Sequence, residues 1–169
     1  AGIQTAAIIA GGQRPPGSVA EAETYDGSSW TEVGDINTAR RGLPGVGTQT
    51  AAMIIGGFPG ATDEVEQYDG SSWTSELWDG SSWTEVGDLN TARYYARACC
   101  GTSTAALQIG GLRQTPPAAL ENVEEWNGSG WTEVADISTT RRSLGGAGTT
   151  TAGLAFGGTP PVTGATEEW

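Results

Sequence analysis

The sequence contains no histidine and no lysine, and its only cysteines are the adjacent Cys99 and Cys100. Without histidine, the chain lacks imidazole metal ligands, the usual general base and the common form of the catalytic triad. Adjacent cysteines rarely form a disulfide, because the required geometry strains the peptide between them, and their spacing does not suit a zinc site. We therefore expect two free thiols on opposite faces of a strand, one packed and one exposed, no metal, no cofactor and no enzymatic activity.

Long apolar runs are also missing. No uninterrupted stretch reaches the ~18 residues that a membrane span requires, so we expect no membrane insertion. The 20 acidic residues outnumber the eight arginines, and the formal net charge is −12. This excess of carboxylates repels phosphate groups and argues against nucleic acid as a partner. The 27 glycines, with many serines and threonines, favour short strands and tight turns.

Two sequence blocks recur along the chain. The block Tyr25–Arg40 returns, barely altered, as Trp78–Arg93 and Trp126–Arg141. A shorter apolar unit begins with Thr-Ala and ends with Gly-Gly, and it occurs at Thr5–Gly12, Thr50–Gly57, Thr104–Gly111 and Thr151–Gly158. The Gly-Gly pairs are 45, 54 and 47 residues apart. A period of this size indicates supersecondary units that bury their apolar faces against one another in a stack or ring.

Each unit has the pattern of four short strands. Residues 41–48 are small and glycine-rich, which suits a strand where backbones approach closely, and residues 50–55 form an apolar run that we expect to be buried on both faces. Glu64–Tyr68 and Ser72–Thr74 supply the third and fourth strands, and Asp69-Gly70 between them is a hairpin-turn signal. Four meandering antiparallel strands per unit predict the blade of a β-propeller, hence an all-β fold with almost no helix.

The order of these marks resembles the kelch repeat. The double glycine Gly56-Gly57, the strand Glu66-x-Tyr68-Asp69, Trp73 and Arg93 correspond to the family pattern, and the resemblance covers essentially the whole chain. The near-identical copies are also similar to repetitive kelch-like proteins of bacteriophages, especially marine ones, which belong to tail or fibre proteins. The resemblance implies a kelch-like β-propeller of four-stranded antiparallel blades, about four of them in this chain.

The blade units of this single array (residues 1–169) are expected at residues 1–37, 38–90, 91–138 and 139–169. Within the second unit, Ser75–Trp83 is a tandem copy of the outer hairpin, which explains the longest spacing. The pattern gives the first and last units three strands each, without the innermost strand in the first and the outermost in the last. Because these gaps are not complementary, three readings stay open: a four-bladed ring, part of a larger propeller, or an oligomer that closes between chains. Unpaired strand edges favour self-association, in which the duplicated Leu77–Trp83 hairpin would take part.

Charged and aromatic residues recur with the blade period. A carboxylate lies two residues before the aromatic residue of the third strand, and an arginine follows each long block; these residues are Glu23, Glu66, Glu124 and Glu167, and Arg40, Arg93 and Arg141. Catalysis rarely uses four symmetric carboxylates, so we expect structural Arg–Glu pairs that fix the register between strands or blades. The periodic Trp30, Trp73, Trp83 and Trp131 are expected to serve packing. The periodic Asp35, Asp88 and Asp136 are expected to cap turns.

The residues that depart from the repeat are the candidates for binding. Arg41, Tyr94 and Arg142 directly follow the repeat arginines, and the resemblance places this position at the mouth of the central channel, where kelch propellers often contact ligands. The plain alternative is a solvated arginine at a loop edge. The segments after each Gly-Gly vary in length and content, as binding loops do; these are Gln13–Ser18, Phe58–Asp63, Leu112–Leu120 and Thr159–Thr163.

These features predict a non-catalytic structural or adhesion module, part of a phage virion appendage that binds a surface glycan or a protein. Such a module would be exposed on the virion or on a cell surface. The alternative is an intracellular, cytoplasmic kelch scaffold that binds an acidic peptide through Arg41 and Arg142.

Overall fold

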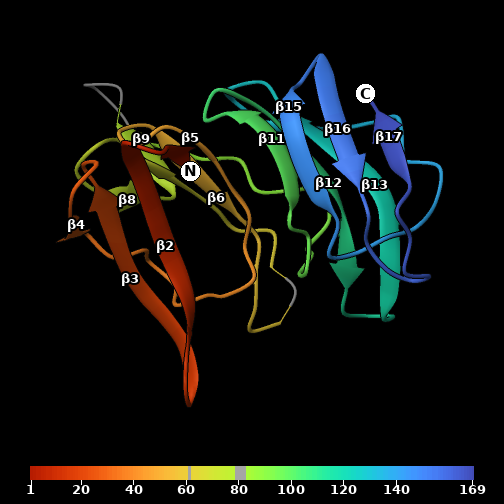
Figure 1. Ribbon diagram of the computed structural model, residues 1–169, viewed down its shortest axis with the longest axis horizontal. Coiled ribbons are helices and arrows are strands. Elements are labelled where there is room, and N and C mark those ends of the chain that lie inside the picture. Colours follow the sequence, from red (N-terminus) through yellow and green to blue (C-terminus); the bar gives the residue numbers. More distant parts are fainter. Residues whose placement is uncertain (61, 79–82) are drawn as a thin grey trace.

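The computed structural model describes residues 1–60, 62–78 and 83–169, and this part of the chain is all-β without a helix. Four antiparallel sheets are arranged as the blades of a four-bladed β-propeller (Figure 1). Blade 1 consists of β1 (Gly2–Ile3), β2 (Ala6–Arg14), β3 (Gly17–Tyr25) and β4 (Trp30–Val33). Blade 2 consists of β5 (Gly45–Gly47), β6 (Ala52–Ile55), β7 (Val65–Tyr68) and β8 (Trp73–Thr74). Blade 3 consists of β11 (Ala98–Thr102), β12 (Ala105–Arg113), β13 (Ala118–Trp126) and β14 (Trp131–Val134). Blade 4 consists of β15 (Gly145–Thr149), β16 (Ala152–Phe156) and β17 (Thr166–Glu168).

Within each blade the strands pair in sequence order, which is the predicted meander. The apolar strand β6 is buried along its whole length, as its sequence predicts. The outer hairpin of blade 2 turns at Asp69, whose carboxylate accepts hydrogen bonds from the backbone N–H groups of Ser71 (2.8 Å) and Ser72 (2.9 Å). Gly70 follows with φ of 99°, a conformation that glycine adopts without strain.

Two features of the strand pattern differ from the sequence prediction. Blade 1 has an innermost strand, β1, because the pairs Gly2–Ala7 and Ile3–Ala6 are enough to continue the ladder. The duplicated hairpin forms a separate two-stranded sheet of β9 (Glu76–Trp78) and β10 (Trp83–Glu85), so within the described residues it completes no blade. Residues 79–82 of this hairpin lie outside the described residues. Blade 4 has three strands, as expected.

Three hydrophobic clusters join successive blades. Ile8 and Ala22 of blade 1 pack with Ile54, Tyr68 and Trp73 of blade 2. A second cluster fills the junction of blades 2 and 3 and contains Met53, Ile55, Val65, Ala106, Trp126 and Trp131. A third fills the junction of blades 3 and 4 and contains Leu107, Ile109, Val123, Leu144 and Ala155. Blades 2 and 3 contribute apolar residues from both faces, and blades 1 and 4 from one face each, so burial against neighbouring blades is what stabilises them.

The innermost strands approach one another closely, as the small-residue pattern predicts. Strand β11 packs against β5 on one side and against β15 on the other. At Gly146 of β15, an added Cβ would lie only 3.0 Å from the backbone N and O of Cys99. Glycine at this position therefore permits the backbone contact between blades 3 and 4.

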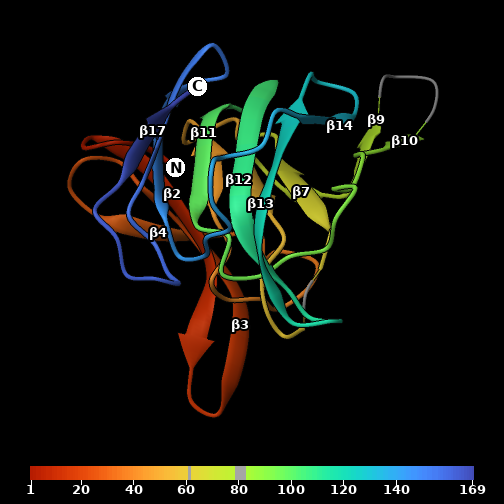
Figure 2. The ribbon, with the colours of Figure 1, turned by 90° about the vertical axis from the view of Figure 1, so that its right-hand side faces the viewer.

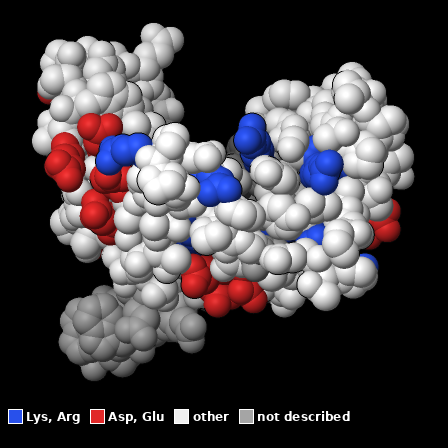
Figure 3. Space-filling model, turned by 90° about the horizontal axis from the view of Figure 1, so that it is seen from below, with Lys and Arg blue, Asp and Glu red and all other residues white. Residues whose placement is uncertain are grey.

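Blades 1 and 4 lie at opposite ends of the long axis of the molecule (Figure 1). In the described part of the chain, no hydrophobic cluster joins them. Ile9 and Trp30 of blade 1 are 50% and 46% exposed, and Leu154 and Phe156 of blade 4 are 37% and 44% exposed. Seen from below, the surface is hollowed between the two ends (Figure 3). The faces of blades 1 and 4 that point away from the other blades are therefore uncovered.

Candidate functional site

A buried ion pair lies at the junction between blades 1 and 2. The guanidinium of Arg40 donates from Nη2 to Glu66 Oε1 at 2.5 Å, and both side chains are buried. Its Nη1 donates to the carbonyls of Gly56 (2.9 Å) and Glu64 (3.1 Å). The other carboxylate oxygen of Glu66 accepts the backbone N–H of Asn37 at 2.8 Å. The segment that leaves blade 1 is thus held on blade 2 through both oxygens of the Glu66 carboxylate.

The same arrangement recurs at the next two junctions. Arg93 pairs with Glu124, and Arg141 pairs with Glu167. Each carboxylate also accepts a backbone N–H from the preceding blade's connection, from Asn90 in one junction and Ser138 in the other. Desolvation lowers the pKa of Arg93, and the neighbouring Glu124 opposes that shift. Each of these three arginines is therefore paired with a glutamate within a blade junction, as the sequence predicts.

Glu23 differs from the other three repeat carboxylates. No arginine lies within ion-pair distance of it in the described residues. The physical reason is its position on the uncovered face of blade 1, against which no connecting segment packs. Trp30, on the same face, is half exposed, whereas Trp73 and Trp131 are buried as expected for packing residues. The side chain of Trp83 lies outside the described residues.

Arg41, Tyr94 and Arg142 occupy equivalent positions in blades 2, 3 and 4. Each forms an isolated antiparallel bridge with the residue that follows the double glycine of its own blade, namely Phe58, Leu112 and Thr159. They therefore lie at the end of the molecule from which the variable loops and the long β2–β3 hairpin project (Figures 1 and 2). We call this end the rim. Residue 61 of the loop Phe58–Asp63 lies outside the described residues.

A cation and three aromatic rings form a continuous cluster on the rim. The Arg41 guanidinium lies 4.0 Å from the centre of the Phe58 ring and donates to the Ser18 hydroxyl at 3.1 Å. The centroid of Phe58 is 6.1 Å from that of Tyr94, which in turn is 4.9 Å from that of Tyr95. Tyr95 is exposed and has a positive φ of 51°, and its carbonyl accepts the backbone N–H of Ser143 at 2.8 Å. The cluster thus begins with a positioned cation and ends in an exposed phenol.

Sequence reasoning singled out Arg41 and Tyr94 but not the residues that hold them. Phe58 was placed only in a variable loop, and Ser18 only at the end of another. A signal for Tyr95 exists in the repeat: it stands where the other blades have Gly42 and Ser143, so it is the one bulky side chain at that position. Arg142 lies in the equivalent backbone bridge, but among the described residues it makes no cation–π contact with the rings of the Arg41 cluster.

The rim is locally basic although the chain as a whole is acidic. In the described residues, no carboxylate pairs with Arg41 or Arg142. Arg97 and Arg113 are exposed and lie close in sequence to rim residues. Figure 3, which views this end, shows basic side chains toward the middle of the face and acidic side chains toward its edge. A ligand at the rim would therefore meet positive charge at short range.

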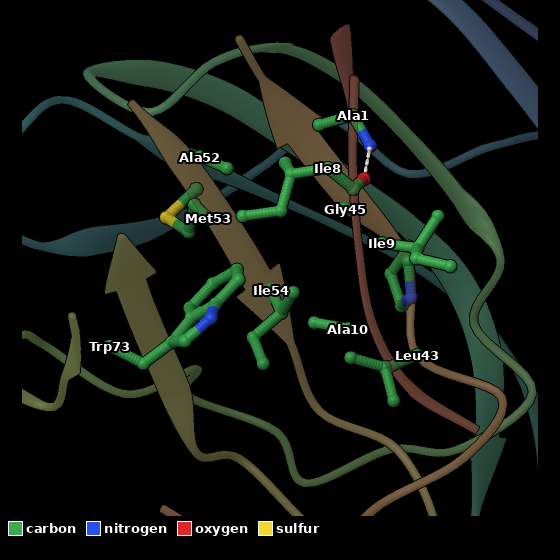
Figure 4. Close-up of a pocket in the computed structure, with 11 residues that line it drawn as sticks. Ala1, Ile8, Ile9, Ala10, Leu43, Gly45, Ala52, Met53, Ile54 and Trp73 are labelled. Atoms are coloured by element: carbon green, nitrogen blue, oxygen red, sulfur yellow. Dashed lines mark hydrogen bonds between the residues drawn. The ribbon is translucent and has the colours of Figure 1, made fainter. Parts of the chain in front are cut away.

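A cavity of about 200 Å³ lies in the junction of blades 1 and 2 (Figure 4). Ile8, Met53, Ile54 and Trp73 point into it, and the lining is mostly aliphatic. The indole N–H of Trp73 is buried without a hydrogen-bond partner. The side chains of its wall are not titratable, so they offer packing space.

Cys99 and Cys100 lie in β11 of blade 3. Cys99 and Cys100 are both free; Cys100 is buried and Cys99 is half-buried rather than exposed. Burial raises the pKa of the Cys99 thiol to about 12, so the unreactive thiol form prevails at neutral pH. No group of three or more potential ligands is placed to hold a metal ion within the described part of the chain.

No protein-family model matches the chain, and no curated protein matches it. Among the described residues, no helix has the length and apolar character that crossing a membrane requires.

Proposed function

We propose that this chain is a non-catalytic recognition module with kelch-like blades, part of a bacteriophage virion appendage, which binds a surface glycan or a protein at its rim. The kelch-like marks and the near-identical blocks of the sequence support the family and the origin. The observation that carries the binding proposal is the cluster of Arg41, Phe58, Tyr94 and Tyr95. Among the described residues Arg41 has no carboxylate partner and lies on the half-buried Phe58 ring, and the chain of ring contacts ends in the exposed Tyr95.

The arginines of the blade junctions differ from those of the rim in their partners. Arg40, Arg93 and Arg141 are each paired with a glutamate inside a blade junction. Arg41 instead lies on an aromatic ring, and Arg142 makes no ion pair among the described residues. Since the glutamates of the blade junctions are already paired, the charges of Arg41 and Arg142 are available to a ligand. Variable loops around a constant frame are the usual construction of a binding surface.

The chemistry of the rim favours a ligand that carries carboxylate or hydroxyl groups. A guanidinium forms charge-assisted hydrogen bonds with a carboxylate, and the exposed phenol of Tyr95 can stack on a sugar ring or donate a hydrogen bond. The net charge of −12 opposes long-range attraction of anions, so the interaction is short-ranged and of modest affinity. An acidic glycan fits these conditions.

An acidic peptide bound by an intracellular scaffold is the second candidate, and the basic character of the rim favours it. Screening the chain against a glycan array and against a library of acidic peptides separates the two. The Arg41→Ala/Arg142→Ala variant should lose the bound class, whereas Arg14→Ala, which removes an exposed cation already paired with Glu21, should keep it.

The same variants also test the location of the site. If binding survives the double substitution but is lost when the exposed residues 113–117 are replaced by a Gly-Ser segment, which leaves the buried Leu112 and Leu120 in place, the ligand is held by this loop and the proposal for Arg41 and Arg142 is wrong. If no glycan and no peptide binds, the module is a spacer and the recognition proposal fails.

A further inference from the structure

The three filled junctions of this chain share one construction. An arginine binds the third-strand glutamate of the following blade, the backbone N–H of an Asn or Ser binds the other carboxylate oxygen, and a buried aliphatic residue precedes that Asn or Ser. These aliphatic residues are Ile36, Leu89 and Ile137. We call the face of a blade that carries this glutamate its receiving face. In blades 2 and 3 the receiving face also has an aromatic pair, formed by the third and fourth strands, beside the glutamate.

Blade 1 carries the same receiving face without an occupant. The strand register places Ile9 opposite Glu23 and Tyr25 opposite Trp30, so all four side chains lie on one face. We call this the open face of blade 1. The corresponding pairs in blade 2 are Ile54 opposite Glu66 and Tyr68 opposite Trp73.

Burial is the main difference between the two faces. Ile54 and Trp73 are 5% and 6% exposed because blade 1 covers them, whereas Ile9 and Trp30 are about half exposed. The two aromatic pairs keep nearly the same geometry, with ring centroids 5.0 Å apart in blade 1 and 5.2 Å apart in blade 2. The open face is therefore already in the conformation of a filled junction, and binding would require no rearrangement of its rings.

We infer that the open face of blade 1 binds a further blade segment of the same repeat type, which supplies an arginine to Glu23. The occupant is defined by its chemistry: an Ile or Leu, then an Asn or Ser, and an arginine three residues after that. The carboxylate of Glu23 would accept the guanidinium and the backbone N–H, as Glu66 does from Arg40 and Asn37. This interaction surface is independent of the rim and of its ligand.

A second copy of the chain fits the open face less well. The uncovered face of its blade 4 offers Leu154 and Phe156, but Glu168 lies opposite Leu154 on that face and would bring a second negative charge toward Glu23. The repeat arginines of that copy are already bound to their own glutamates. Charge complementarity therefore favours an arginine-bearing segment over the blade 4 face.

The chain itself supplies the probe. A peptide with the sequence of residues 131–146 contains Ile137, Ser138 and Arg141 in the required order. The labelled peptide is titrated with the full chain, and binding is followed by fluorescence anisotropy. We expect saturable binding that weakens about 30-fold or more with the Glu23→Gln chain or with the Arg141→Met peptide, since each leaves one charge of the pair unmatched. Glu168→Gln is the matched control and should bind as the unmodified chain does.

A second experiment joins the segment covalently to the chain, in case the free peptide binds too weakly to measure. In the repeat, Ala1-Gly2 takes the place of Ala147-Gly148, and Gly2 and Gly148 have nearly the same φ, 110° and 108°. Residues 131–146 can therefore be joined directly before Ala1 in register. Linkage raises the effective concentration of the segment. We expect a higher melting temperature and a blue-shifted tryptophan emission as Trp30 is covered, and both gains should be lost when the added arginine is replaced by Met.

Two results would overturn the inference. One is a joined chain that melts no higher than the original and keeps its emission spectrum, together with no binding of the free peptide. The other is a dimer of the original chain that Leu154→Asp and Trp30→Asp each abolish, with no competition from the peptide. That outcome would assign the open face to blade 4 of a second copy.

Discussion

Replacing Glu124 by alanine should destabilise the protein far more than the same change at Glu23, although both residues occupy one position of the repeat. Glu124 is fully buried, binds Arg93, and accepts the backbone N–H groups of Asn90 (2.6 Å) and Thr91 (3.2 Å). Its loss leaves the buried guanidinium of Arg93 without a counter-charge and two donors without an acceptor. Breaking a buried pair in this way costs about 3–5 kcal/mol.

Glu23 has none of these partners in the described residues, so Glu23→Ala should change the free energy of unfolding by no more than about 0.5 kcal/mol. For a chain of this size each kcal/mol lowers the melting temperature by roughly 2–4 °C. Glu124→Ala should therefore melt about 6–20 °C lower than the unmodified protein, and Glu23→Ala within about 2 °C of it. Scanning calorimetry gives the melting temperatures and urea unfolding gives the free energies.

The double variant Arg93→Met/Glu124→Leu separates the cost of the stranded charge from the cost of lost packing. Removing both charges should destabilise less than the sum of the single changes, because no unpaired ion remains. Equal losses for Glu124→Ala and Glu23→Ala would refute the reasoning, since they would show that burial and pairing at this position do not contribute to stability.

Three further predictions concern the rim, the turn at Asp26 and the contact between blades 3 and 4. Arg41→Ala/Arg142→Ala should lower binding at the rim while the free energy of unfolding stays within about 1 kcal/mol, which calorimetry beside the binding assay checks. The pKa of Asp26 should be about 2 in an NMR titration, because the backbone N–H of Ser29 and the hydroxyl and N–H of Ser28 donate to it. Its stabilising effect should be complete above its unfolded pKa of about 3.9 and disappear as the pH falls through 2, and a titration midpoint near 3.9 would contradict this. Gly146→Ala should destabilise clearly, because its Cβ would lie 3.0 Å from the backbone of β11, whereas Gly130→Ala, which meets nothing within 4 Å, should be nearly neutral in the same calorimetric comparison.

The period of the repeat was enough to predict the fold class, because it repeats both the apolar strand and the turn. Of the run at residues 50–55, Ala52–Ile55 is buried as expected while Thr50 and Ala51 are exposed, and the Asp69-Gly70 turn has the hydrogen bonds of its type. Local patterns of this kind determine strands and hairpins directly. The number of strands at the start of the chain was predicted less well, because two residues of β1 suffice to form a ladder and no sequence pattern of that length is distinctive.

Residue spacing alone could not identify the cluster at Arg41. Its contact to Phe58 lies within blade 2, but the residue after the double glycine varies from blade to blade, so the repeat does not predict an aromatic ring there. Its contact to Ser18 reaches a loop of blade 1, so it depends on how the blades are placed. The unpaired state of Glu23 has the same origin. Its sequence neighbourhood matches that of Glu66, and only the absence of a packed arginine-bearing segment in the structure distinguishes them.

The repeat places an arginine in each blade junction and a variable residue directly after it at the rim, so one repeat can serve both stability and recognition. Each junction pairs a buried arginine with a glutamate, which is buried in the first two junctions and partly exposed in the third, so blade packing leaves no unpaired cation in the interior at these sites. The residue after that arginine points instead to the variable loops, where Arg41 and Tyr94 differ from blade to blade. Substitution at this second position leaves the ion pair intact, so the rim can change without loss of blade register. A repeat that fixes Arg40 and varies Arg41 therefore separates stability from recognition within two neighbouring residues.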